Sequence, residues 1–458
     1  MGNGMGLSMQ EEFAELDFNS IRLEKRFIKT METLAGQPDK SIWFSSENRA
    51  EAKAIYRMLN NDGLNREEIL RAHREATIRR MVQSERTILA VQDTTSLNYN
   101  TQTKMEGIGY ISDKTLGVNI HSCLAVTVDG LLLGLLAQSS YNREQPHNRG
   151  RTHDSKKVRP LEEKESFRWV KTLGESTIDI PCGVRIVTVC DREGDMYELF
   201  DEAERESQAF LIRIVQNRKT VENEKILDEI RKITCMGKVK TTIPRDSRRG
   251  FKEREAVLQI RYHRFQVQRP HILNKVKNLK SAHEVNVIYV LEEPQDEAIE
   301  PIEWFLMTNE PVETVEAAYE KAVWYMQRWK VEQFHHVLKS GCTVEKLQER
   351  SMEKTTTLVL MYSIIAATIM NITYIARIHP QLPCTVCFEE DEWKALYCTA
   401  NKTKKPPKKP YTIAEAIIYL SWLGGPKRAP SDGPPGAKTI WIGIDKLNTL
   451  LAYKEWLP

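Results

Sequence analysis

The residues best suited to chemistry lie in the stretch "YMQRWKVEQFHHVLKSG", residues 325–341. Four polar residues recur there at spacings of three, four and seven: Tyr325, Arg328, Glu332 and Lys339. Apolar residues alternate with them at Trp324, Val331, Phe334 and Leu338. This pattern predicts one amphipathic helix with a phenol, two cations and a carboxylate along one face. An ordinary exposed ion pair between Arg328 and Glu332 would give the same pattern, so it does not by itself establish a site.

Two more carboxylates follow apolar, β-prone runs. Asp93 follows "ILAVQ" and Asp191 follows "RIVTVC". We expect each run to be a buried strand that ends at its aspartate, which places both carboxylates at a sheet edge. The alternative for Asp191 is a capping role, because aspartate often caps the turn or helix that follows a strand.

Convergence of these two aspartates with Glu332 would require neutralising cations, since three carboxylates a few ångströms apart repel one another strongly. Hard oxygen ligands suit Mg²⁺ or Mn²⁺. Two such ions can clamp the attacking and leaving oxygens of a phosphoryl transfer. Arg328 and Lys339 would then hold substrate phosphates, with Tyr325 as a further hydrogen-bond donor.

The bulk composition limits the possible classes of protein. The chain has 458 residues, enough for two or three domains, and a formal net charge of only +3. Overall charge therefore does not indicate nucleic acid, and such an argument must rest on local features. Eight cysteines in this length do not make a disulfide scaffold, and the sequence does not open with a secretory signal. We expect a cytoplasmic protein.

Residues 355–376, "TTTLVLMYSIIAATIMNITYIA", carry no charge and are long enough to span a bilayer. They also contain several threonines, Ser363 and Asn371, and no second such segment accompanies them. We favour a buried core helix over a membrane span.

The order of predicted elements points to an α/β fold. Residues 8–85 predict helices, and Asp129-Gly130 predicts a hairpin turn between two apolar strands. Residues 210–308 are β-rich and basic, and "NKTKKPPKKP" predicts a linker or exposed arm. The order strand–Asp, hairpin, helix, strand–Asp, long insertion, helix–Glu fits a ribonuclease-H-like sheet with a metal site.

These motifs resemble the DDE transposases of bacterial insertion sequences, in the subgroup marked by Tyr-x2-Arg-x3-Glu-x6-Lys that includes the transposon-five transposase. The signature stands at Tyr325, Arg328, Glu332 and Lys339. "QDTTSLNY" around Asp93, "VCDREGD" around Asp191 and "TNEPVE" are also similar to that family. Weaker likenesses in "SSENRAEAKAIYRMLNN" and "DGPPG" extend the resemblance over nearly the whole chain.

The resemblance implies three domains. Residues 1–85 would be a helical domain that binds the transposon end. Residues 86–376 would be a ribonuclease-H-like catalytic domain, a mixed five-stranded sheet with helices, carrying a β-rich insertion at about 215–308. Residues 377–458 would be a C-terminal dimerisation domain, and the enzyme would act on double-stranded DNA as a homodimer without any membrane.

The resemblance also implies a mechanism. Asp93, Asp191 and Glu332 would bind two Mg²⁺ ions, with Mn²⁺ as a substitute. The DNA would be nicked, the freed 3′-OH would form a hairpin with the opposite strand, and the reopened end would be joined to target DNA. The open alternatives are a nuclease of the same fold that does not join strands and a DNA-binding protein without catalysis.

The implied DNA contacts extend beyond the signature. Trp304 stands where the family places a tryptophan that receives a flipped base, although a core role in a buried strand would also explain it. The other residues carried over as DNA-binding are Tyr325, Arg328, Lys339, Arg192, Arg213, Trp329, Arg26 and Lys29. Further basic candidates in the N-terminal helices are Arg22, Lys25, Arg71, Arg74, Arg79 and Arg80.

Two other groups of side chains have less specific patterns. Cys384, Cys387 and Cys398 with His379 could be drawn as a zinc site, but the spacing is irregular and no second CxxC exists, so we favour ordinary cysteines. We expect His335 and His336 to serve packing or to lie near DNA rather than to bind metal.

Overall fold

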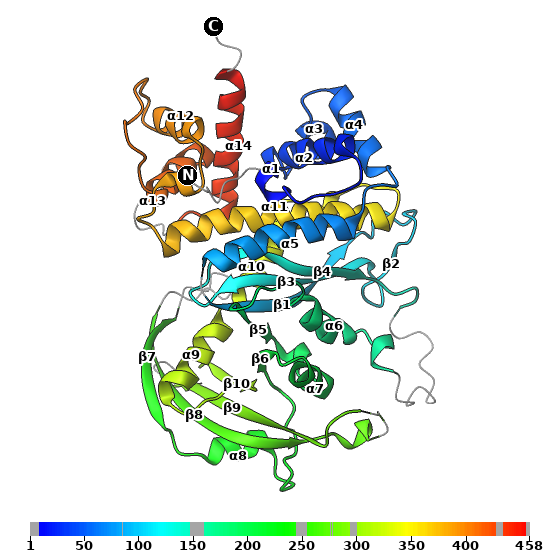
Figure 1. Cartoon of the computed structure of the whole chain (residues 1–458), viewed down its shortest axis with the longest axis vertical. Coiled ribbons are helices and arrows are strands. Elements are labelled where there is room, and N and C mark those ends of the chain that lie inside the picture. The colour runs from blue at the N-terminus through cyan, green and yellow to red at the C-terminus, as the bar shows by residue number, and fades with distance from the viewer. Residues whose placement is uncertain are drawn as a thin grey trace. The chain divides into compact units, whose positions relative to one another are not determined.

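The computed structural model describes residues 9–84, 86–146, 160–243, 254–274, 276, 278–293, 300–426 and 434–454. The chain forms two compact units (Figure 1). The first comprises Met1–Arg86, Thr94–Gly150 and Lys330–Pro458, and the second comprises Thr87–Asp93 and Arg151–Trp329. Both contain helices and strands, so the predicted α/β class is confirmed. The division into three domains stays a prediction.

The N-terminal part of the first unit is helical, as predicted. Its helices are α1 (Met9–Glu12), α2 (Ile21–Gly36), α3 (Ile42–Ser45), α4 (Arg49–Leu59) and α5 (Arg66–Gln83). The side chains of Ser20, Asn48 and Asn65 each accept a hydrogen bond from a backbone N–H in the first turn of α2, α4 and α5, respectively. Phe27 and Met31 on α2 and Ile69 on α5 are completely buried.

The first unit also holds a hairpin sheet. Its strands are the later part of β1 (Thr87–Asn98), β2 (Gly109–Tyr110), β3 (Leu116–Thr127) and β4 (Leu132–Tyr141). β3 and β4 pair antiparallel across the predicted Asp129-Gly130 turn, where Gly130 has φ of 96°. Helices α5 and α11 (Met352–Ile378) lie along β4 (Figure 1).

Helix α11 is the uncharged segment that is long enough to cross a bilayer. By length and composition it qualifies as a span, but 94% of its most apolar window is buried in the structure. Two of its polar residues form internal hydrogen bonds: Ser363 Oγ accepts from Gln138 at 2.9 Å, and Asn371 donates to the Leu132 carbonyl at 2.7 Å. These contacts fit a core helix.

Shorter elements complete the first unit. They are α10 (Trp329–His336), η5 (Val337–Gly341), η6 (Val344–Lys346), η7 (Cys384–Val386), α12 (Glu390–Ala400), α13 (Ile413–Gly424) and α14 (Ala437–Lys454). Thr412 forms a capping box with Glu415 at the start of α13.

The second unit is a mixed sheet with helices. Its strands are β5 (Arg185–Cys190), β6 (Ala209–Arg213), β7 (Gly237–Ile243), β8 (Arg254–Gln268), β9 (Ala282–Glu292) and β10 (Glu303–Thr308). Starting with the early part of β1, their order is β1-β5-β6-β10-β9-β8-β7. The first two pairings are parallel and the remainder are antiparallel. The predicted β-rich insertion thus extends this sheet through β10. Most of the cationic loop "IPRDSRRGFKERE" lies outside the described residues.

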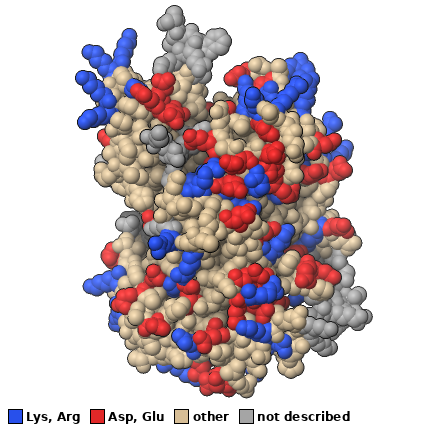
Figure 2. Space-filling model, viewed as in Figure 1, with Lys and Arg blue, Asp and Glu red and all other residues tan. Residues whose placement is uncertain are grey.

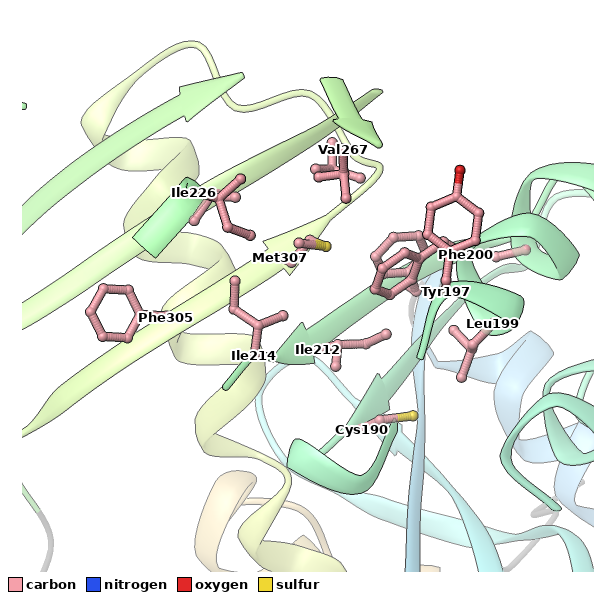
Figure 3. Packing of buried hydrophobic residues seen from close by; sticks show 14 of the residues in the cluster. Cys190, Tyr197, Leu199, Phe200, Ile212, Ile214, Ile226, Val267, Phe305 and Met307 are labelled. Carbon is pink, nitrogen blue, oxygen red and sulfur yellow. The ribbon is translucent and has the colours of Figure 1, made fainter. Parts of the chain in front are cut away.

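Helices cover the sheet of the second unit. They are η2 (Leu161–Glu163), α6 (Phe167–Glu175), η3 (Arg192–Gly194), α7 (Tyr197–Arg205), α8 (Ile226–Lys232), η4 (His271–Leu273) and α9 (Val315–Met326). Figure 3 shows the core that they enclose, where Phe200 stacks on Phe210 with ring centroids 5.3 Å apart. Replacing Phe200 by alanine would lower the free energy of unfolding by about 3–5 kcal/mol. The packing of this core therefore stabilises the strands that carry the site.

Candidate active site

Two aspartates follow the paired segments of two adjacent parallel strands. Strands β1 and β5 pair in register up to Val91 opposite Val189. If that register continues for two more residues, Asp93 comes opposite Asp191 with both side chains on one face of the sheet. Both aspartates are half-buried, and neighbouring strands lie about 4.8 Å apart, so this register would bring the two carboxylates near each other.

Only one of these aspartates ends its strand. Asp191 directly follows β5, as predicted, but β1 continues past Asp93 to Asn98. The expectation that the strand ends at Asp93 was therefore wrong. The sequence after Asp93, "TTSLN", is itself rich in β-prone threonine and alternates buried with exposed residues, which explains why the strand continues.

Asp191 combines a capping role with its place beside Asp93. Its Oδ1 accepts a hydrogen bond of 2.8 Å from the backbone N–H of Glu193, at the start of η3. A carboxylate offers about four lone-pair sites, so the cap leaves acceptor capacity on Asp191. The capping interpretation and the site interpretation are compatible, because one carboxylate can serve both.

A row of side chains continues from the aspartates across the sheet. Strand β6 pairs parallel to β5 with Ile212 opposite Cys190, so the next residue, Arg213, stands opposite Asp191. Arg213 is in turn opposite Leu306 on β10, and its Nη2 donates to the Glu303 carbonyl at 3.2 Å. The arrangement places a cation directly next to the carboxylate pair.

Tyr325, at the end of α9, packs against this row. It is only 5% exposed, and its ring meets that of Trp304 edge-on, with centroids 5.5 Å apart and planes at 68°. Burial raises the pKa of the Tyr325 phenol, Arg328 and Arg213 oppose that rise, and Asp191 adds to it. These electrostatic partners indicate that Tyr325 lies among the same charged groups. Trp304 is half-buried, so part of its side chain packs against the protein and part remains accessible to solvent.

Arg328 brings a second cation to the aspartates. Its Nη1 lies 3.6 Å from Asp93 Oδ2, and its guanidinium carbon lies 6.0 Å from the centre of the Tyr325 ring. The second unit thus gathers two carboxylates, two guanidinium groups, a phenol and an indole on neighbouring elements. Such a mixed-charge site can bind a cation through the carboxylates and a phosphate through the arginines.

The prediction of one helix over 325–341 was wrong. Helix α9 ends at Met326, α10 begins at Trp329, and η5 with π-helical hydrogen bonding follows. The N–H groups of Gln327 and Arg328 bond to carbonyls three residues back, at 3.0 Å each. These tighter turns close α9 before α10 begins, so residues 325–341 are not one continuous α-helix. The predicted apolar set is confirmed as buried: Trp324, Val331, Phe334 and Leu338.

Glu332 and Lys339 belong to the first unit. Glu332 lies in the first turn of α10 and Lys339 in η5, and both are half-buried. Two neighbours fix α10 against α11. The Tyr374 hydroxyl donates to Gln333 Oε1, and the Lys330 ammonium lies 3.5 Å from the centre of the Tyr374 ring. Burial lowers the pKa of Lys330 to about 8, which marks this as a closely packed helix face.

The remaining candidate DNA contacts lie on exposed or half-buried positions. Arg192 and Trp329 are exposed in the second unit. On α2, Arg26 is half-buried and Lys29 is exposed, with its ammonium 4.0 Å from Glu51. Arg22, Lys25, Arg26 and Lys29 recur at helical spacing on α2.

Three of the candidate arginines of α5 make contacts within the N-terminal helices. Arg71 bonds to Glu68 at 2.7 Å, Arg79 donates to the Glu11 carbonyl at 3.1 Å, and Arg80 pairs with Glu12 at 2.7 Å. Their geometry favours α2 over α5 as the basic surface of the N-terminal helices.

One supporting pair was not predicted from sequence. Asp195 is 2% exposed, lies 2.6 Å from Arg218, and accepts the N–H groups of Val215 and Gln216 at 3.0 and 2.9 Å. This buried ion pair ties η3, which follows Asp191, to the segment that follows Arg213. The second aspartate of "DREGD" was the available signal, but nothing in the sequence pairs it with Arg218.

Within the described residues, no group of three or more His, Cys, Asp or Glu side chains is placed to hold a metal ion. The Asp93–Asp191 pair nevertheless supplies the hard oxygen donors that a divalent cation such as Mg²⁺ prefers. Cys384 and Cys387 are buried, and burial raises the pKa of their thiols to about 11 and about 12, respectively. His379 Nε2 lies 3.8 Å from Asp129 Oδ2.

His335 is a buried residue of α10. It is 7% exposed, and burial lowers its pKa to about 3, so the imidazole is a neutral core group. Its neighbour His336 is exposed. The packing role that we expected for this pair fits His335.

Three family models match the chain. They are described as Transposase DNA-binding over residues 7–64, Transposase DDE domain over residues 145–369, and Transposase Tn5 dimerisation domain over residues 364–454. Together they span most of the chain. Asp191 and Glu332 lie inside the second match, and Asp93 lies before it.

Among solved structures, the chain is similar to a piggyBac transposase synaptic complex with hairpin DNA. The TM-score is 0.40 and the identity 11%, over 98% of this chain and 80% of the other. At that TM-score the likeness carries no argument about this chain.

Proposed function

Because the chain belongs to the DDE transposases of the transposon-five type, we propose that it excises its element through hairpin ends and joins the 3′-OH ends to target DNA. The chain is a DNA transposase, and its catalytic domain has the ribonuclease-H-like fold of this family. DNA is its partner, and it forms dimers. Divalent metal ions serve the DDE family in general.

The proposal includes the metal ligands. Asp93, Asp191 and Glu332 would hold two Mg²⁺ ions, which Mn²⁺ could replace. Support comes from the register that sets Asp93 opposite Asp191, and from the half-buried Glu332 at the start of α10. When bound, such ions lower the pKa of a coordinated water and stabilise charge on a phosphoryl group.

The cationic residues would position the substrate. Arg328 and Lys339 would grip phosphates next to the cut, with the Tyr325 hydroxyl as a further donor. Arg213, opposite Asp191, would offset the negative charge of the carboxylates and the phosphate. Guanidinium groups suit this task because their planar N–H donors match phosphate oxygens in pairs.

Trp304 would receive the flipped base when the hairpin forms. A tight hairpin forces a base out of the stack, and an aromatic face can stabilise it there. The edge-on contact with buried Tyr325 supports the role, because it fixes the indole next to the cations while leaving the residue half-exposed. Arg192 and Trp329, both exposed, would add contacts along the DNA.

We further propose a three-part division of labour. Residues 1–85 would bind the terminal repeats, with Arg26 and Lys29 as contacts on α2. Residues 86–376 would catalyse, and residues 377–458 would form the homodimer. The order of the three family matches along the chain, DNA-binding, DDE and dimerisation, supports this order of roles. The protein would act in the cytoplasm, where bacterial DNA lies.

The observation that carries the proposal is the row Asp93–Asp191–Arg213, joined by Arg328 at 3.6 Å from Asp93. The test is cleavage of a DNA fragment that carries the element's terminal repeat, with Mg²⁺ or with a chelator. We expect a nick, then a hairpin at the transposon end, then joining to a plasmid, all dependent on Mg²⁺. Nicks without hairpin or joining would indicate a nuclease of the same fold, and binding without any cleavage would indicate a DNA-binding protein.

A further inference from the structure

The loop between α12 and α13, residues 401–410, carries a concentrated positive charge that the active site does not use. The loop, called the basic arm below, has the sequence "NKTKKPPKKP", with five lysines and no acidic residue. All five ammonium groups are on exposed residues: Lys402, Lys404, Lys405, Lys408 and Lys409. None of them forms an ion pair with any part of the chain that the structure describes. Figure 2 shows blue side chains projecting over this loop, which Figure 1 places between α12 and α13.

The basic arm is held at its base. At its start, the N–H groups of Asn401 and Thr403 donate to the carbonyls of Tyr397 and Cys398, at 3.0 Å each. At its end, Tyr411 accepts the Cys384 N–H at 2.8 Å, and its hydroxyl donates to the Trp393 carbonyl at 2.8 Å.

Aromatic packing reinforces that base. The Tyr411 ring contacts Trp393, Tyr397 and Tyr419, with centroids 5.9, 5.9 and 5.2 Å apart. Three prolines within the arm, Pro406, Pro407 and Pro410, restrict its backbone further. A loop fixed in this way loses less conformational entropy on binding than a free lysine tail does.

Charge is distributed unevenly along α12. Acidic residues gather at its N-terminal end, Glu389, Glu390, Asp391 and Glu392, and the arm follows its C-terminal end. Eleven helical residues separate the two ends by about 16 Å. The Debye length is about 8 Å at physiological salt, so the acidic end does not neutralise the arm. A polyanion would therefore approach from the C-terminal end of α12.

We propose that the basic arm is a second DNA-binding surface, which grips the phosphate backbone of duplex DNA without reading its sequence. Lysine ammonium groups bind phosphates as point charges, and no base-reading group such as arginine, asparagine or glutamine stands between the lysines. The arm lies within the dimerisation match, residues 364–454. Contact with an acidic surface of a second copy is the competing outcome that the test must separate.

The test measures binding of a repeat-free duplex and of a terminal-repeat duplex by fluorescence anisotropy, without divalent metal and over a salt series. A four-lysine variant replaces Lys404, Lys405, Lys408 and Lys409 by glutamine. A matched pair of double variants compares Lys408→Gln/Lys409→Gln with Lys104→Gln/Lys114→Gln, whose exposed lysines have no assigned role. All substitutions are on exposed residues, and thermal melting verifies that each variant is folded.

Each lost phosphate contact should lower the slope of log affinity against log salt by about 0.9. We expect Lys408→Gln/Lys409→Gln to lower this slope by about 2, and the four-lysine variant to lower it further. The affinity for DNA should also fall at least about tenfold. The double control should match the native protein. A loss confined to repeat-free DNA would assign the arm to target DNA, and an equal loss on both duplexes would assign it to duplex backbone in general.

Two results would overturn the proposal. Unchanged salt slopes on both duplexes, with a weakened dimer in sedimentation equilibrium, would assign the arm to the partner subunit. Unchanged slopes with an unchanged dimer would make it a solvated loop. Because binding is measured without metal, neither result depends on whether the protein cleaves DNA.

Discussion

Arg328 Nη1 lies 3.6 Å from Asp93 Oδ2, so a guanidinium group stands beside a carboxylate that we propose as a metal ligand. Without metal, this arginine offsets part of the repulsion between Asp93 and Asp191. In the proposed reaction, the N–H groups of Arg328 bind a substrate phosphate beside Asp93. Replacing Arg328 should therefore lower the rate of cleavage without lowering the affinity for metal.

Replacing Arg328 by glutamine should lower single-turnover cleavage about 100-fold or more, because a positioned charge on the phosphate is lost. Arg328→Lys should retain part of the rate, since a point charge remains without the paired donors. Affinity for Mn²⁺, followed by electron paramagnetic resonance, should not fall, because a competing cation next to Asp93 is gone. Cleavage at the native rate, or weaker Mn²⁺ binding, would contradict this role.

Substitutions at Asp191 can separate its two roles. Asp191→Ser keeps an oxygen acceptor for the Glu193 N–H but removes the carboxylate. Asp191→Cys offers a softer ligand that favours Mn²⁺ over Mg²⁺. We expect both variants to fold and to lose Mg²⁺-dependent cleavage by about 1,000-fold or more. Mn²⁺ should restore cleavage by the cysteine variant alone. A serine variant that cleaves well with Mg²⁺ would show that capping is the only role of Asp191.

Trp304→Ala should slow hairpin formation more than the first nick. Stacking of a base on an aromatic ring contributes about 1–3 kcal/mol, which corresponds to about 5- to 150-fold in rate. Trp304→Phe, which keeps an aromatic face against Tyr325, is the matched control and should lie near the native rate. Nicked and hairpin products are resolved on denaturing gels. Equal slowing of both steps would indicate that Trp304 serves only the core.

His335 should make the protein sensitive to acid. Its folded pKa of about 3 lies below its ordinary value of 6.5, so the unfolded chain binds more protons between these values. The free energy of unfolding should hold above pH 6.5 and fall as the pH drops through 6.5. At pH 5 the loss from this residue is about 2 kcal/mol.

His335→Asn should flatten that dependence in urea unfolding between pH 7.5 and 5, whereas the exposed neighbour variant His336→Asn should not. Parallel curves for native protein and His335→Asn would show that this histidine already carries its proton in the folded state.

The sequence predicted local elements better than tertiary relationships. Asp191 follows its strand, the Asp129-Gly130 turn forms a hairpin, and residues 355–376 are a core helix, because each depends on local pattern and burial. The break at Arg328 was missed, since the spacing of polar residues is the same whether the helix continues or closes at Gln327. The pairing of Asp195 with Arg218 was missed because only tertiary contact reveals it.

The register between strands could not be predicted from the sequence either. Asp93 lies on β1, Arg213 on β6, and Asp191 directly follows β5, so their alignment depends on parallel pairings across long separations. The resemblance named these residues but could not say that they form one row. The basic arm shows the opposite case, since its exposure followed from composition alone.

The most direct test of the whole account is cleavage of the terminal-repeat DNA with Mg²⁺ by Glu332→Gln, beside the exposed control Glu353→Gln. Both variants remove one negative charge within a helix and keep the size of the side chain. We expect Glu332→Gln to bind the repeat normally yet to produce no nick or hairpin, while the control cleaves like the native protein. Cleavage by Glu332→Gln at the native rate would contradict the three-carboxylate site.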